Sequence, residues 1–219
     1  HAPKGMAIKG DTLYVADIDC VKRFVRTSGA PAGEICFQGA TFLNGVAMDG
    51  NGTLYVTDSG LKPDFTSSGT DAVWRFTPDG QTVKVIEGSV LGGPNGLAFR
   101  GQDGFVVTFG SGEIYQIGPN NNRNVVLPGA PDRALDGIVF TKDGGYLFSS
   151  WGDKAVHRVD TQGVTSRVLE NVEAPAGIGY DAKRNRVLVP LFNGNEVRIK
   201  PLASVPATTT PPAADTTKP

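Results

Sequence analysis

The sequence predicts an all-β protein with the architecture of a β-propeller. Five segments of the 219-residue chain resemble one another, and their first glycines lie 40, 51, 41 and 40 residues apart. Each segment reads as a short apolar strand, a turn, a second strand and a third alternating strand, usually followed by a fourth. Four antiparallel strands that recur about every 40 residues are typical of propeller blades. Abundant glycine and the lack of long stretches at helical spacing indicate the same fold class.

The five copies follow one another through most of the chain. They read PKGMAIKGDTLYVAD from Pro3, LNGVAMDGNGTLYVTD from Leu43, PNGLAFRGQDGFVVTF from Pro94, LDGIVFTKDGGYLFSSW from Leu135 and PAGIGYDAKRNRVLVPLF from Pro175. A β-sandwich would not need matching copies. The last copy stops after its third strand, EVRIKPL, and the chain opens directly on the first strand of a blade. We therefore expect five blades over residues 1–202, and we expect that an N-terminal piece of the propeller is missing from this sequence.

Residues 203–219 are rich in proline and threonine and contain no aromatic residue. Such a segment has little to bury, so we expect a disordered tail or a linker. Stalks of this composition are more usual outside the cytoplasm, which favours a periplasmic or secreted protein over a cytoplasmic one.

Composition argues against several classes of partner. The formal net charge is −1 and no basic block stands out, so we expect no nucleic-acid partner. No apolar run approaches the roughly 20 residues that a membrane helix needs, so we expect no membrane insertion. Cys20 and Cys36 lie on neighbouring predicted strands, where a disulfide is geometrically possible, but we expect two buried free thiols. We expect a monomer that binds a small molecule.

The repeat predicts which residues meet at the mouth of the channel. The innermost strand of every blade lines the axis, so residues at the start of these strands become neighbours around one ring. The residues just before the repeated glycines are Lys4, Asn44, Asn95, Asp136 and Ala176. The second strand is antiparallel to the first and ends at the same face. Those ends are occupied or adjoined by Asp17, Asp58, Phe109, Trp151 and Phe192. Amides, carboxylates and aromatic rings together are the mixture expected of a small-molecule pocket.

The longest interval between copies carries an insertion at the same face. Compared with the first copy, about eleven residues are inserted between Asp58 and the next strand, within SGLKPDFTSSGTDA. The insertion is either a lid over the pocket or a neutral surface loop.

Asn44, Asn95 and Asp136 form a candidate metal site. Their oxygens suit Ca²⁺ best, with Mg²⁺ or Mn²⁺ possible and Zn²⁺ less suited. An Asn or Asp before a glycine can also simply make a turn. Recurrence of such residues in three consecutive copies, at the position facing the axis, favours a metal. One carboxylate makes a weak site, and a second could come from Asp58 or from the missing N-terminal part.

The LNG, PNG and LDG triplets, each followed by an apolar strand and a GTLYVTD-like strand, resemble the regucalcin/gluconolactonase superfamily of six-bladed propellers. The resemblance covers residues 1–202 and implies five of six blades. It implies a divalent metal held by Asn44, Asn95 and Asp136, with Asp136 as the general base. The family's first-blade Glu ligand has no counterpart here. Members that bind sugar lactones carry an arginine two positions before the first Asn, where this chain has Phe42.

These features predict a metal-dependent hydrolase that acts on a small lactone or ester in the channel. Asp136 would remove a proton from the attacking water, and the metal would polarise the carbonyl. Substrate contacts are expected from Phe42, Asp58, Phe109 and Trp151. The three aromatic residues among them suit a substrate less polar than gluconolactone. Two alternatives stay open. One is a non-catalytic binding or scaffold propeller, and the other is an enzyme like the strictosidine-synthase propellers.

Overall fold

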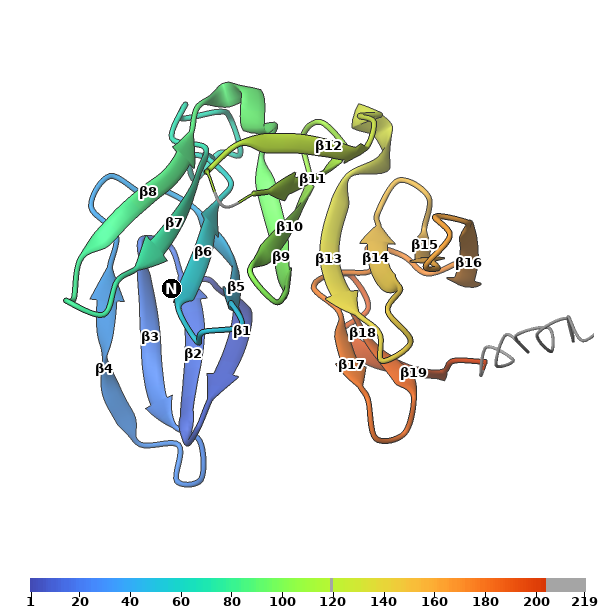
Figure 1. The fold of residues 1–219 in the computed structure, drawn as a ribbon, viewed down its shortest axis with the longest axis horizontal. Coiled ribbons are helices and arrows are strands. Elements are labelled where there is room, and N and C mark those ends of the chain that lie inside the picture. Colours follow the sequence, from blue (N-terminus) through green and yellow to red (C-terminus); the bar gives the residue numbers. More distant parts are fainter. Residues whose placement is uncertain (119, 204–219) are drawn as a thin grey trace, which may run out of the picture.

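The protein is a five-bladed arc of antiparallel sheets. The computed structural model describes residues 1–118 and 120–203. Five sheets follow one another in chain order around the arc, from blue to orange in Figure 1. Their inner strands are neighbours in the order β1, β5, β9, β13 and β17. The all-β fold and its blades are therefore confirmed. A sixth blade stays a prediction, and the predicted tail lies outside the described residues from position 204 onward.

Within residues 1–118 and 120–203, four blades have four strands and the fifth has three. Blade 1 consists of β1 (Pro3–Lys9), β2 (Thr12–Asp17), β3 (Cys20–Val25) and β4 (Pro31–Cys36). Blade 2 consists of β5 (Leu43–Met48), β6 (Leu54–Asp58), β7 (Ala72–Phe76) and β8 (Thr82–Glu87). Blade 3 consists of β9 (Pro94–Arg100), β10 (Asp103–Thr108), β11 (Ile114–Ile117) and β12 (Arg123–Leu127). Blade 4 consists of β13 (Leu135–Phe140), β14 (Tyr146–Ser150), β15 (Ala155–Val159) and β16 (Thr165–Leu169). Blade 5 consists of β17 (Gly179–Asp181), β18 (Arg186–Leu191) and β19 (Glu196–Pro201).

Two short 3₁₀ turns precede inner strands, η1 (Ser89–Leu91) before β9 and η2 (Pro131–Arg133) before β13. No helix in the described part of the chain is long and apolar enough to cross a membrane. The fifth inner strand is shorter than the sequence predicts. Pro175 still pairs with Leu191 as an isolated bridge, but the ladder resumes only at Gly179. Glycines at 177 and 179 have no side chains to pack there, which weakens the strand.

The core lies between the blades. Alternate residues of a strand point to opposite faces of its sheet, so each blade presents one apolar face to the blade before it and one to the blade after it. Val73 packs between blades 2 and 3, whereas its neighbour Trp74 packs between blades 1 and 2. Val106 and Val107 divide in the same way between the two sides of blade 3. Four such clusters join the five blades into one body.

The repeated glycines allow the inner strands to approach one another. A Cβ added to Gly5, Gly45 or Gly96 would lie less than 3.0 Å from the backbone carbonyl oxygen of the residue before the next repeated glycine. Real Cβ atoms essentially never come that close. At Gly137 the added atom would collide in the same way with the backbone at Gly177 and Ile178. A side chain at any of these positions would therefore push two blades apart.

This close approach gives a stability test. Gly45→Ala should destabilise the protein by about 1–3 kcal/mol, as overpacking in a well-packed core does. Gly179→Ala is the matched control, since an added Cβ there meets only Leu188 at the ordinary distance of 3.9 Å. Urea unfolding of both variants measures the difference. Equal loss of stability in the two would contradict the role given to the inner-strand glycines.

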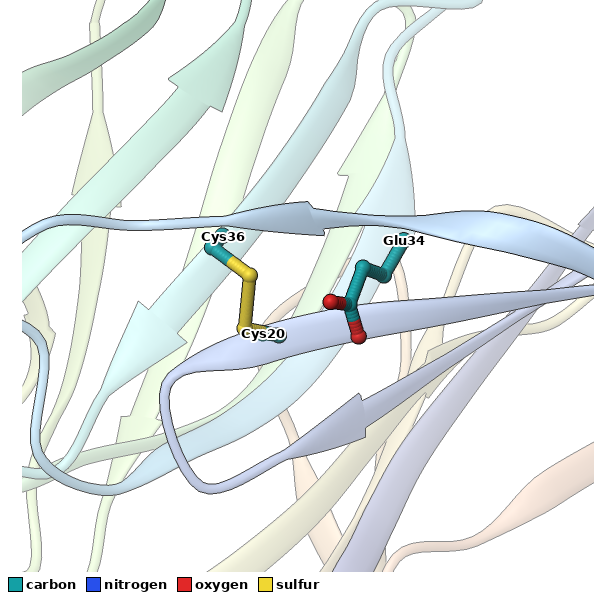
Figure 2. Close-up of side chains that lie close together, drawn as sticks. All are labelled: Cys20, Glu34 and Cys36. Carbon is teal, nitrogen blue, oxygen red and sulfur yellow. A yellow bond between two sulfur atoms is a disulfide. The ribbon is translucent and has the colours of Figure 1, made fainter.

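Cys20 and Cys36 form a disulfide, so the prediction of two free thiols is wrong. The two residues lie directly opposite each other on β3 and β4. Partners in such a pair point to the same face of the sheet, which brings the sulfurs together. Figure 2 shows the bond beside the carboxylate of Glu34. These three side chains lie near enough to resemble a metal cluster, but sulfurs bonded to each other are not thiolate ligands.

Reduction of this bond should lower the free energy of unfolding. The sequence separation of 16 residues corresponds to a stabilisation of about 3 kcal/mol by restriction of the unfolded chain. Urea unfolding with and without reductant measures it, and the doubly substituted Cys20→Ser, Cys36→Ser protein is the control that reductant should not affect. Identical unfolding curves for oxidised and reduced protein would contradict the expectation.

Candidate functional site

The residues before the repeated glycines form a ring at one face of the arc. Lys4, Asn44, Asn95 and Asp136 lie in the inner strands of blades 1 to 4, and Ala176 precedes the short inner strand of blade 5. A Cβ added to any of the first four repeated glycines would meet the backbone carbonyl oxygen of the next ring residue at 3.0 Å or less, so these residues are neighbours in order around the axis. The structure thus places the three predicted metal ligands at adjacent positions of one ring.

Hydroxyl groups hold two of these junctions together. Thr57 accepts a hydrogen bond from the amide of Gly45 at 2.7 Å and donates one to the carbonyl of Asn95 at 2.5 Å. Thr57 thus joins blades 2 and 3. Ser149 does the same between blades 4 and 5, where it accepts from the amide of Gly137 and donates to the carbonyl of Ala176, at 2.7 and 2.9 Å. The inner strands bulge at these glycines, and the hydroxyls satisfy backbone groups that the sheet ladder leaves unpaired.

Asp17 and Asp58 are the last residues of their strands and point inward. Asp58 is wholly buried and accepts hydrogen bonds from the backbone amides of Thr41, Phe42 and Gly60, at 3.0 to 3.1 Å. Asp17 accepts one from the amide of Ala2 at 2.6 Å. Both carboxylates therefore hold the backbone that leads into the ring. Asp58 offers no exposed oxygen to a substrate or metal in this arrangement.

The strand register explains this difference from the predicted site. Asp58 pairs with Leu43, the first residue of its inner strand, and the residues in the same place in blades 3 and 4 are Thr108 and Ser150. The residues that follow form a second tier at the mouth: Ile18, Ser59, Phe109, Trp151 and Phe192. The alignment of the copies was shifted by one residue at this point. It placed Asp17 and Asp58 at the same position as Phe109, Trp151 and Phe192, which in fact lie one residue further along. Pairing each strand end to its inner strand would have separated the two sets.

The second tier contacts the ring within the same blade. Ser59 accepts a hydrogen bond from the side-chain amide of Asn44 at 3.2 Å and donates one to the carbonyl of Pro94 at 2.6 Å. Trp151 donates its indole N–H to Oδ2 of Asp136 at 3.0 Å. Asn44 and Asp136 are therefore both oriented by the residue that follows the second strand of their blade. Ser59 was missed by the sequence analysis as a site residue.

Asp136 is the ionisable group that stands out at the mouth. Its side chain keeps some contact with solvent but is largely surrounded by protein. Burial raises the pKa of the Asp136 carboxyl to about 7, and the hydrogen bond from Trp151 opposes part of that rise by stabilising the charged form. At neutral pH this carboxyl is close to half ionised, which suits a group that accepts and releases protons.

Aromatic rings cover the mouth beside Asp136. Trp151 contacts Phe109 edge to face, with ring centroids 5.3 Å apart, and Phe192 at 5.4 Å. Phe192 remains 68% exposed. Phe109 and Trp151 were predicted to contact substrate, and the structure brings them together in one cluster with Phe192 on blades 3, 4 and 5.

The insertion after Asp58 lies over the same face as the ring. It begins at Ser59, which contacts both Asn44 and the carbonyl before Asn95. It folds back as a short hairpin, in which Leu61 pairs with Ser67. Phe65 at its tip packs on Phe42 with centroids 5.9 Å apart. The insertion therefore lies at the same face as the ring, as the sequence predicts, and its role as a lid stays a prediction. Phe65 itself was not identified from the sequence.

Lys4 lies beside Phe42, the ring on which Phe65 of the hairpin packs. Its ammonium sits 4.1 Å from the centroid of the Phe42 ring and donates a hydrogen bond to the carbonyl of Ala2 at 2.9 Å. Burial lowers the pKa of the Lys4 ammonium, and the negative charge of Asp17 opposes that effect. The ring thus contains a cation in blade 1 and an acid in blade 4.

The ring fits a hard divalent cation by its donor chemistry. Asn44 uses its amide N–H on Ser59, which leaves its carbonyl oxygen available, and Asp136 uses Oδ2 on Trp151, which leaves Oδ1. Ligands oriented by neighbouring hydrogen bonds in this way are usual in metal sites. Only one carboxylate takes part, and the positive charge of Lys4 lies in the same ring. These residues therefore fit a weakly bound cation such as Ca²⁺.

The family to which the chain belongs follows from its sequence. The family described as the SMP-30/gluconolactonase/LRE-like region matches residues 37–180. The chain belongs to this family. The match spans the ring from Asn44 to Asp136 and confirms the resemblance noted from the triplets. No curated protein sequence matches the chain.

Solved structures similar to this member of the SMP-30/gluconolactonase family include enzymes and a calcium-binding protein. A gluconolactonase from Xanthomonas campestris is 20% identical, with 92% of this chain and 72% of that chain covered and a TM-score of 0.72. Regucalcin from Agrobacterium tumefaciens is 17% identical, with 86% and 67% covered and a TM-score of 0.67. Virginiamycin B lyase from Staphylococcus aureus is 14% identical, with 92% and 67% covered and a TM-score of 0.70. At these identities the likeness concerns the fold, and the chain spans 62% to 67% of the streptogramin lyase structures.

The contact between Trp151 and Asp136 predicts a pKa change. Trp151→Phe removes the N–H that stabilises the charged carboxylate, so the pKa of Asp136 should rise above about 7. Carbon-detected NMR titration of the aspartate carboxyl groups measures the shift. Phe192→Leu is the control, since it alters the aromatic cluster without removing a donor to Asp136. An unchanged or lower pKa in Trp151→Phe would contradict the assignment.

Proposed function

We propose that this chain is a hydrolase that acts on a small lactone or ester at the mouth of the channel, with Asp136 as the general base. The observation that carries the proposal is the place of Asp136, an acid with a pKa near 7 in the ring, held by Trp151. A carboxylate with such a pKa is matched to proton abstraction at neutral pH. Membership of the SMP-30/gluconolactonase family supports the same class of reaction.

The residues of the mouth have different roles in the proposed reaction. Trp151 holds Oδ2 of Asp136, so Oδ1 would serve both as a ligand of a divalent ion and as acceptor of the proton from the attacking water, with one lone pair for each. The aromatic cluster around Trp151 keeps bulk water from this side of the acid and offers an apolar wall to the substrate. Asn44, Asn95 and Asp136 would hold the divalent ion. When bound, that ion would supply Lewis-acid polarisation of the carbonyl.

We also propose a location outside the cytoplasm, as the composition of the tail suggested. The Cys20–Cys36 disulfide supports this proposal, because such bonds persist mainly in oxidising compartments.

Asp136→Asn tests the function. The purified chain is freed of metal with a chelator, resupplied with Ca²⁺, Mg²⁺ or Mn²⁺, and assayed for acid release from a panel of lactones and esters. The metal-free carboxyl has a pKa of about 7 and a bound cation lowers it, so activity of the metal-loaded protein should rise with pH through a value below about 7, and Asp136→Asn should lose at least about a hundredfold, as removal of a general base does. Asp132→Asn, a nearby exposed acid, is the control. Full activity in Asp136→Asn would overturn the proposal, and binding without any turnover would favour the non-catalytic propeller.

Stability measurements on the same variant check that it is folded. The pKa of Asp136 is higher in the folded than in the unfolded protein, so protonation of this carboxyl favours the folded state. Its contribution to the wild type's free energy of unfolding is therefore fully present below about pH 4 and is lost as pH rises through about 7. Asn cannot ionise, so Asp136→Asn should be more stable than the wild type at pH 8. Their difference should shrink toward pH 4. A fixed difference across this range would show that the carboxyl does not carry the raised pKa.

A further inference from the structure

Phe65 occupies a backbone position that a bulky residue rarely adopts. It lies in a turn with φ +63°, its amide donates to the carbonyl of Lys62 at 2.9 Å, and Thr66 closes the turn. Glycine is the residue that takes such a conformation without steric cost, and an aromatic side chain there is an outlier. Strain of this kind persists only where the surrounding structure maintains it, and it is concentrated at functional sites.

The ring of Phe65 is also poorly buried for its size. It is 70% exposed at the tip of the hairpin and touches Phe42 by one edge. Its packing in the free protein therefore does little to offset the backbone strain. The base of the hairpin lies against blade 3, because Ser59 and Gly110 both lie beside Gly93. Phe109 immediately precedes Gly110, so the hairpin and the Phe109–Trp151–Phe192 cluster border the same mouth.

Lys4 adds a specific polar group to this apolar surface. Its ammonium lies over the face of Phe42, and only one of its three N–H donors is accounted for by the carbonyl of Ala2. A ligand group that packs beside Phe42 meets this cation. A carboxylate, or less strongly a carbonyl oxygen, is the group that such a donor favours.

We infer that the mouth binds an aryl-carboxyl compound, that is, a planar apolar ring that bears a carboxylate or its ester. Phe65 and Phe42 on the blade 2 side and the Trp151 cluster on the other side contact the ring, and Lys4 contacts the carboxyl oxygen. This inference names the ligand class of the proposed hydrolase and rests on the same mouth, but it concerns binding and not hydrolysis. Phe65 acts as a specificity-determining residue.

Two naphthalene compounds test the inference. 2-Naphthoate carries the carboxylate and is not a substrate for hydrolysis, and methyl 2-naphthoate is its neutral ester. The protein contains two tryptophans, so ¹⁵N-labelled protein gives two indole signals. The Trp151 signal should shift and saturate with ligand, while that of Trp74, which is buried between blades 1 and 2, should stay fixed. No saturable shift of the Trp151 signal would overturn the inference.

Variants of Phe65 and Lys4 separate the two contacts. Phe65→Gly relaxes the turn, so its melting temperature should equal or exceed that of the wild type, while both ligands should bind about 3- to 10-fold more weakly through loss of an aromatic contact. Phe65→Tyr keeps the ring and should bind like the wild type. Lys4→Met should weaken 2-naphthoate about 3- to 10-fold and the ester less. Wild-type affinity in a folded Phe65→Gly protein, or equal losses for both ligands in Lys4→Met, would contradict the assignment.

Hydrolysis is judged separately. Naphthoate binding with no turnover of any ester leaves the ligand class intact and overturns the proposed reaction. Turnover of aliphatic lactones without naphthoate binding does the reverse.

Discussion

The inner strands of this propeller approach each other so closely that only glycine fits between them. A Cβ on Gly45 or Gly96 would collide with the carbonyl of the residue that precedes the next repeated glycine. This constraint fixes where each blade sits against the next. Because the residue before each glycine is then forced beside its counterpart in the following blade, a ring of Asn44, Asn95 and Asp136 follows from the packing of the backbone itself. The chemistry of the ring can change from blade to blade without changing that packing.

Polar side chains near the mouth serve two different purposes, and the sheet register separates them. Where an inner strand bulges at its glycine, backbone amides and carbonyls lose their ladder partners, and buried groups of this kind are costly unless they are paired. Thr57 and Ser149 bridge these breaks, and Asp58 receives the amides that lead into the ring. The hydrogen-bonding groups of these side chains are used to pair backbone groups and stabilise the fold. The residues that follow the second strands of blades 2 and 4, Ser59 and Trp151, instead hydrogen-bond to the ring residues Asn44 and Asp136.

The repeat was sufficient to predict the fold, the blades and the ring, because all three depend on spacing and on glycine. It did not determine the ends of the second strands, since a shift of one residue exchanges a buried position for an exposed one. That shift placed Asp58 among the expected substrate contacts and hid Ser59. The spacing of the repeat also could not predict the disulfide. Neighbouring strands bring Cys20 and Cys36 near each other, but only the pairing of β3 with β4 shows that they are directly opposite. Phe65 lies in an insertion that no other copy shares, so no comparison between copies could point to it.

The mouth is therefore asymmetric although the scaffold is repetitive. Blades 3, 4 and 5 place aromatic residues in the second tier, whereas the first two blades place Ile18 and Ser59 there. The aromatic side surrounds Asp136, and burial of that carboxyl raises its pKa. Trp151 contributes both to the apolar wall and to the hydrogen bond that opposes the rise. The same choice of residue at one repeated position thus affects both the protonation of Asp136 and the polarity of the surface beside it, so these two properties of the mouth are physically coupled.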